Sequence, residues 1–203
     1  MAITPMFPLG NVLFPSIGLP LRIFEPRYMQ MLTECLAAEG EFGTVLIERG
    51  SEVGGGDKRF TMATMAKVID ASAQDDGTWH VMAVGTRRLK VVGWVPDDPY
   101  PQADCDEAPD PQEAEPQAVA AVISQLRRLL AMSAEANLPT APATVEFSED
   151  PTFALWQACA VAPLSPIDDY ALLCAPSASE RITLLGTLLD DEVTVVGHRL
   201  SGR

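Results

Sequence analysis

Residues 8–32, PLGNVLFPSIGLPLRIFEPRYMQML, decide how the rest of the chain is interpreted. They contain two short apolar runs, residues 11–14 and 19–24, on either side of a turn at residues 15–18. Short apolar runs bounded by proline and glycine are typical of β-strands joined by a turn. Glu25-Pro26 then begins a helical pattern, since proline is favoured at the first position of a helix. We therefore expect an apolar hairpin followed by a helix, with the later strands extending the hairpin.

The segment up to residue 105 predicts one helix and a series of short strands. The helix ends at Gly40 and carries an apolar stripe at helical spacing, formed by Tyr28, Met29, Leu32, Cys35 and Leu36. Strands are expected at residues 42–48, 60–71, 78–84, 88–94 and 100–105. Asp76-Gly77 is a strong hairpin signal, because a type I′ turn needs positive φ angles. Short strands with such connections predict a small closed or half-closed barrel.

The composition changes at residues 104–117, DCDEAPDPQEAEPQ, which are acidic and rich in proline. Beyond them the pattern is helical, beginning with an apolar face at Val119, Val122, Ile123, Leu126, Leu129 and Leu130. Three further helix starts carry capping signals, at Asp150-Pro151, at Ser165-Pro166 and in the box from Ser177 to Glu180. Residues 193–196 fit either the last helix or an extended run. The sequence thus predicts a β-domain at residues 1–108 and a helical bundle at residues 109–203.

The charge of the chain argues against nucleic acid as its main partner. Of 203 residues, 14 are basic and 28 acidic, so the net charge is −14. The acidic excess is spread over both predicted domains, and such a surface repels phosphate backbones and anionic membranes. The N-terminus lacks the pattern of a signal peptide, and no apolar run is long enough to span a membrane. We expect a cytoplasmic protein that does not enter the membrane.

The sequence contains no motif that predicts catalysis, a cofactor or a metal. None of the three lysines follows a glycine, as a P-loop requires. The two histidines and four cysteines lack ligand spacing, and the cysteines are expected to be free thiols. The run Gly54-Gly55-Gly56 is interpreted as a hairpin tip, because it precedes a strand and so offers no helix terminus to a phosphate. The expected catalytic, cofactor and metal sets are therefore empty.

The apolar residues of the opening stretch remain as candidates for binding. Six of them, at positions 14, 17, 19, 21, 23 and 24, exceed what one face of a short hairpin needs to bury. One interpretation is that all belong to the core, as most large apolar residues do. The other is that some of them form a groove for an extended or unfolded chain, and for this role we select Phe14, Ile17, Leu19 and Phe24.

The string at residues 8–28 resembles the opening motif of the Lon protease N-terminal domain family, the substrate-recognition domain of ATP-dependent Lon proteases. Similar features follow in order at Phe42-Gly43, residues 50–57, residues 63–68, Asp76-Gly77 and residues 85–91, although Ala63 stands where the family usually has glycine. The resemblance implies an α+β fold, with a PUA-like pseudobarrel followed by a helical bundle. Within the motif, Arg22, Glu25, Pro26, Arg27 and Tyr28 are expected to be structural. Glu25 would cap the helix begun by Pro26 and pair with Arg22 or Arg27.

The resemblance also bears on function. The chain ends at Arg203, which leaves no room for the ATPase and Ser-Lys peptidase domains of a Lon protease. We therefore expect a stand-alone, non-enzymatic module that binds unfolded polypeptide or a partner protein, without a cofactor. Two alternatives stay open: an RNA-binding protein, because related PUA barrels bind RNA, and a hydrolase without a recognisable motif. The sequence does not indicate the oligomeric state.

Overall fold

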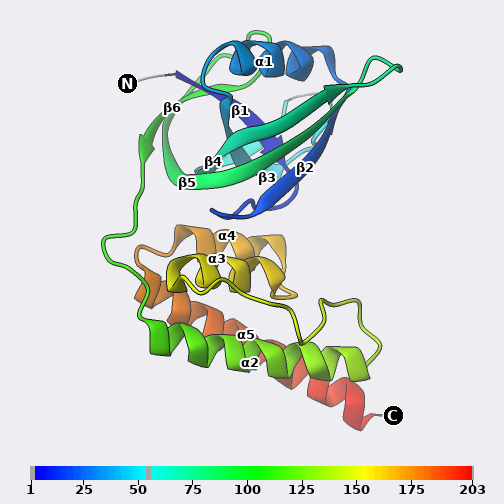
Figure 1. Ribbon diagram of the computed structural model, residues 1–203, viewed down its shortest axis with the longest axis vertical. Coiled ribbons are helices and arrows are strands. Elements are labelled where there is room, and N and C mark those ends of the chain that lie inside the picture. Colours follow the sequence, from blue (N-terminus) through cyan, green and yellow to red (C-terminus); the bar gives the residue numbers. More distant parts are fainter. Residues whose placement is uncertain (1–2, 54–55, 203) are drawn as a thin grey trace. The chain divides into compact units, whose positions relative to one another are not determined.

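The computed structural model describes residues 3–53 and 56–202. The chain divides into two compact units, Met1–Pro109 and Asp110–Arg203 (Figure 1). In the described part, the first unit holds the strands and one helix, whereas the second is built from helices. The predicted mixed α+β class is confirmed.

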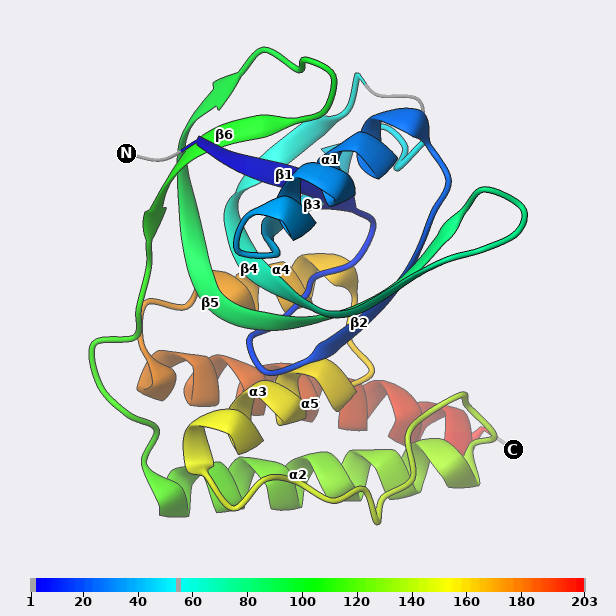
Figure 2. The same cartoon turned by 45° about the horizontal axis from the view of Figure 1, so that its top comes forward.

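The first unit is a β-barrel with one additional strand. Its elements are β1 (Ile3–Leu9), β2 (Gly18–Ile23), α1 (Pro26–Ala37), β3 (Glu41–Arg49), β4 (Lys58–Ala73), β5 (Trp79–Val95) and β6 (Gln102–Glu107). The strand order is β2-β5-β4-β3-β1-β6, and β5 also pairs with β6. Five strands therefore close a ring, in which β1 and β3 are parallel and the other pairs antiparallel. β2 lies outside this ring, along the first part of β5 (Figure 2).

The predicted N-terminal hairpin is wrong. β2 forms where an extended run was expected, but residues 11–14 are not a strand, and β2 pairs with β5 instead. Residues 11–14 are apolar because Leu13 and Phe14 are buried in the core, but their backbone forms a loop. Two contacts hold this loop in place. The Thr64 hydroxyl donates to the Leu13 carbonyl at 2.6 Å. Gly85 allows close approach, since a Cβ there would lie 2.3 Å from the Phe14 carbonyl oxygen.

The later strands follow the prediction more closely. β4 and β5 form the expected hairpin around Asp76-Gly77, where Gly77 has a φ of +80°. The two strands predicted at residues 78–84 and 88–94 are a single strand, β5, whose pairing with β4 shifts register between them. Ala63 lies within β4 and pairs with Val45 of β3 and Leu89 of β5, and the pairing of β3 with β4 shifts register just beyond the Val45–Ala63 pair.

Helix α1 packs its apolar stripe against the barrel. Tyr28, Met31, Leu32 and Cys35 are buried in one core cluster together with Phe42 and side chains from β2 and β5. The helix ends as predicted, because Gly40 has a φ of +71° and its N–H bonds the Cys35 carbonyl. A second cluster occupies the barrel between β1, β3, β4, β5 and β6, formed by Met6, Val45, Ala63, Met65, Leu89, Val91 and Ala103.

The second unit consists of α2 (Pro116–Glu135), α3 (Pro151–Val161), α4 (Pro166–Cys174) and α5 (Ala178–Ser201) in its described residues. The three predicted caps are confirmed, since Asp150, Ser165 and Ser177 each accept a hydrogen bond from the first turn of their helix. Residues 193–196 are helical. Gln125 of α2 donates to the Gly186 carbonyl of α5 at 2.8 Å, so a side-chain hydrogen bond joins these two long helices.

Candidate functional site

The side chains of β2 alternate between the core and the solvent. Leu19, Leu21 and Ile23 face inward, where Ile23 is buried and both leucines pack against the core. Pro20 and Arg22 face outward and are exposed. This alternation is the two-residue period of a strand. Because β2 is the edge of the sheet, it presents both an outer face and an open edge.

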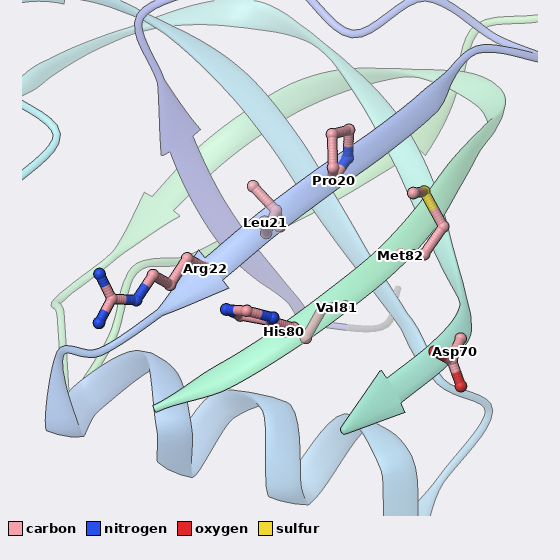
Figure 3. Close-up of a pocket in the computed structure, with 7 residues that line it drawn as sticks. All are labelled: Pro20, Leu21, Arg22, Asp70, His80, Val81 and Met82. Carbon is pink, nitrogen blue, oxygen red and sulfur yellow. The ribbon is translucent and has the colours of Figure 1, made fainter. Parts of the chain in front are cut away.

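A groove lies on the outer face of β2, β5 and β4. It has a volume of about 480 Å³ and is lined by Pro20, Leu21, Arg22, Asp70, His80, Val81 and Met82. We call it the outer groove. In Figure 3, Arg22 and His80 lie toward one end, and Met82 and Pro20 toward the other. Met82 is 38% exposed, so the groove offers an apolar wall beside a charged group.

A second groove adjoins β2 from the side of the 10–17 loop. It has a volume of about 310 Å³, and its walls are mostly apolar: Leu9, Val12, Leu13, Ile17 and Leu19, with Asn11, Gly18, Pro20, Leu21 and Glu52. We call it the loop groove. The Glu52 carboxylate accepts a hydrogen bond from the Gly10 N–H, which ties the 50s loop to this region. Pro20 and Leu21 line both grooves, so β2 lies between them.

Arg22 supplies the positive charge of the outer groove. Its guanidinium pairs with Asp76 at 2.9 Å, and both side chains are more than half exposed. Hydrogen bonds from the Thr78 hydroxyl and amide, together with Arg22, hold the pKa of Asp76 below its ordinary value. An ion pair this exposed contributes little to stability. Arg22 can therefore exchange Asp76 for a ligand group at small cost.

The strand-to-helix corner beside the grooves has a structural role. Glu25 occupies the N-cap position of α1, but its side chain makes no capping bond, so that part of the prediction is wrong. It accepts a hydrogen bond from Arg27 at 3.1 Å, which confirms one of the two expected pairings, whereas Arg22 pairs elsewhere. Arg27 also lies over the Tyr28 ring at 4.4 Å. Burial raises the pKa of Tyr28 to about 12.

The four apolar residues selected from the sequence lie in different environments. Phe14 is only 2% exposed, because its ring is packed inside, and this corrects its placement on a binding surface. Ile17 and Leu19 line the loop groove. Phe24 is 52% exposed and lines neither groove. Polypeptide binding by Ile17, Leu19 and Phe24 stays a prediction.

Sequence reasoning missed the outer groove. His80 and Met82 come from β5 and Asp70 from β4, so the groove depends on the pairing of β2 with β5, which the sequence pattern did not reveal. One residue in the sequence could have indicated that β2 is an edge strand. Pro20 lies in the middle of β2, and proline within a strand is typical of a sheet edge.

Other features of the sequence add no further site. Among residues 3–53 and 56–202, no cluster of His, Cys, Asp and Glu side chains could hold a metal. In the same ranges, no helix combines the length and the apolar character that a membrane span needs. Gly54 and Gly55 lie outside the described residues, and Gly56 has a φ of +76°.

Comparison with known proteins identifies the fold and its family. Residues 3–191 match the family model described as the ATP-dependent protease La (LON) substrate-binding domain. The chain belongs to this family. The resemblance drawn from residues 8–28 is therefore confirmed, and this Lon substrate-binding family accounts for both the β-unit and most of the helical unit.

Curated relatives of this Lon-family chain are much longer proteins. Lon protease 1 of Herpetosiphon aurantiacus is 24% identical over 204 residues, which cover 97% of this chain and 25% of the relative. The Lon protease of Cytophaga hutchinsonii is 28% identical over 104 residues, 50% of this chain and 13% of the relative. The chain thus spans at most about a quarter of the length of these relatives.

A solved structure shares the fold. The crystal structure of the Lon N-terminal domain protein from Xanthomonas campestris aligns with a TM-score of 0.68 and 22% identity. The alignment covers 91% of this chain and 97% of that one. The β-unit followed by helices is thus the architecture of both chains.

Proposed function

We propose that this chain is a non-enzymatic module that binds polypeptide, and that the contact is made around β2. The observation that carries the proposal is an exposed edge strand between two grooves. The substrate-binding description of its family supports a recognition role. Proteins recognise extended chains by combining strand edges with shallow apolar pockets, and both are present here.

The chemistry of the grooves favours an apolar segment that also carries polar groups. The loop groove offers aliphatic walls, whereas the outer groove combines Met82 and Pro20 with Arg22 and His80. Large apolar side chains on a protein surface are typical of interaction sites when they adjoin a hollow. Unfolded proteins expose such segments, so we propose them as the ligand class. Nucleic acid is disfavoured by the net charge of −14.

A matched pair of substitutions tests this proposal. Met82 and Val92 are both exposed apolar residues of β5, but only Met82 lines the outer groove. Binding of fluorescent peptides that tile a denatured protein would be measured by anisotropy, without ATP. We expect Met82→Asp to weaken binding by at least about tenfold, because a groove anchor is replaced by a charge. Val92→Asp should bind within about threefold of the unaltered chain, since most surface positions are energetically neutral.

Two results would overturn the proposal. One is a folded protein that binds no peptide of the tiled set. The other is equal loss in the Met82→Asp and Val92→Asp variants, which would place the contact away from the outer groove. A structured RNA serves as the comparison ligand in the same assay. RNA binding that falls steeply with salt, in the absence of peptide binding, would replace polypeptide by RNA as the ligand.

A further inference from the structure

We infer that the bound polypeptide adds to β2 as a further strand of the sheet, so that its successive side chains enter the outer groove and the loop groove alternately. This inference rests on the proposed function and specifies how the ligand is held. It requires an open row of backbone groups along β2, access to both grooves from that edge, and a ligand of matching chemistry.

The register between β2 and β5 shows which backbone groups face outward. The two strands are antiparallel, with Leu19 opposite Ala83, Pro20 opposite Met82 and Leu21 opposite Val81. In such a ladder, hydrogen-bonded pairs alternate with non-hydrogen-bonded pairs. Proline has no N–H to donate, so Pro20 fits only a non-hydrogen-bonded pair.

The alternation then fixes the neighbouring positions. Leu19 and Leu21 direct their backbone groups toward β5, whereas Pro20 and Arg22 direct theirs to the open edge. Across residues 3–53 and 56–202, β5 is the sole strand that pairs with β2. The carbonyls of Pro20 and Arg22 and the N–H of Arg22 are therefore available to a ligand strand.

Both grooves border β2, since Pro20 and Leu21 line each of them. A strand paired to β2 would lie about 4.8 Å away and point successive side chains to opposite faces of the sheet. Every second side chain would then lie on the face of β2 that carries Leu19 and the loop groove, and the others on the face that carries Pro20 and Arg22, which form the β2 wall of the outer groove. The two-residue period of the ligand matches the two grooves.

This arrangement selects the ligand by pattern rather than by a fixed sequence. Aliphatic side chains suit the loop groove, whose walls are mostly apolar. The outer groove suits apolar or acidic side chains, because Arg22 can exchange its exposed partner Asp76 for a ligand carboxylate. The fitting ligand is an extended segment of about six residues, the length of β2, with an aliphatic residue at every second position.

Arg22 offers a test that separates backbone from side chain. Arg22→Ala and Arg22→Pro both remove the guanidinium, but only proline also removes the outward N–H. Proline at this position does not interrupt the β2–β5 ladder, for the same reason that Pro20 does not. The probe is a fluorescein-labelled peptide of about ten residues, with valine or leucine alternating with threonine or glutamate. Its partner probe has the same sequence with N-methyl groups on alternate backbone amides.

We expect Arg22→Pro to bind the probe at least about tenfold more weakly than Arg22→Ala, since a hydrogen bond at a desolvated edge is lost. N-methylation of the peptide amides that would face β2 should weaken binding to the unaltered protein by a similar factor. This measurement needs no protein variant. Hydrogen exchange should show the Arg22 amide protected when the probe is bound.

Equal binding by the two variants, together with full binding of the N-methylated probe, would overturn strand addition while leaving polypeptide binding intact. Failure of the unaltered protein to bind the probe or any tiled peptide would overturn both proposals. If Arg22→Pro lowers the melting temperature well below that of Arg22→Ala, the N-methylated probe decides the question alone.

Discussion

Replacing Arg181 by methionine tests what holds the helical unit together. The Arg181 side chain is fully buried, and its guanidinium pairs with both carboxylate oxygens of Asp110 at 2.7 and 3.0 Å. It also donates to the carbonyls of Leu172 and Ala175 and lies 3.7 Å from the centre of the Trp156 ring. One side chain thus joins α5 to α3, to the end of α4 and to the segment before α2.

The expected loss follows from these contacts. Methionine fills a similar volume but leaves Asp110 without its guanidinium partner and removes the donors to two carbonyls. Removing one member of a buried ion pair costs about 3–5 kcal/mol. A compact unit of this size has a total stability of about 5–14 kcal/mol. The substitution should therefore remove at least about a fifth of the stability of the second unit, and more than half if the total lies near the lower value.

Urea unfolding followed by the helical circular-dichroism signal measures this loss, because four of the five described helices lie in the second unit. The control is Arg128→Met on α2, where the arginine is exposed, and it should change stability by less than about 0.5 kcal/mol. A double-mutant cycle with Asp110→Asn isolates the pair, and a coupling of about 2 kcal/mol is expected. Equal stability of Arg181→Met and Arg128→Met would refute the reasoning.

Two further predictions concern Asp169 and Gly85. Burial, with Asp168 beside it, raises the pKa of Asp169 to about 7, and one oxygen of its carboxyl group is buried without a hydrogen bond in the described part of the chain. The unfolded state then loses this proton near pH 4 and the folded state only near pH 7, so stability falls as pH rises between these values. Asp169→Asn should match the stability of the unaltered chain at about pH 4 and exceed it by about 1–2 kcal/mol at about pH 8, after discounting for partial exposure. Thermal unfolding across this pH range would contradict the prediction if the stability gained by the variant did not grow with pH. Gly85→Ala should lower stability by about 2–3 kcal/mol, because its Cβ would lie 2.3 Å from the Phe14 carbonyl oxygen. Gly93→Ala on the same strand is the control and should leave stability almost unchanged, since no atom lies within 4 Å of the added Cβ. Equal urea midpoints for the two variants would contradict this prediction and show that the 10–17 loop moves to accept the added methyl group.

Local signals in the sequence predicted the elements that depend on local chemistry. The Asp76-Gly77 turn, the end of α1 at Gly40 and the cap at Ser177 each satisfy backbone groups within a few residues. Such bonds are encoded by neighbouring residues, so one sequence suffices to recognise them. The motif at residues 8–28 indicated the family for a different reason, because it is a long string whose resemblance does not depend on knowing the fold.

Features that depend on distant residues were missed or misplaced. Residues 11–14 have the composition of a strand, but the Leu13 carbonyl accepts a hydrogen bond from Thr64, and the next residues of the loop, Ser16 and Ile17, bond to Gly85. Sequence proximity cannot indicate either partner. The pairing of β2 with β5 joins segments about sixty residues apart, so the outer groove was not predictable from either run alone. Burial also overrides pattern at Phe14, because a large apolar residue in a loop can be a core residue as readily as a surface one.

The barrel is closed without β2, and this has a consequence for function. The second part of β5 closes the ring by pairing with β6, whereas its first part pairs with β2. The core still depends on the inward side chains of β2, because Ile23 is buried with α1. Its outward positions, Pro20 and Arg22, contribute neither to ring closure nor to the core. Substitutions at these positions should therefore change binding without changing stability, and this separation is expected of a strand that serves as a docking edge.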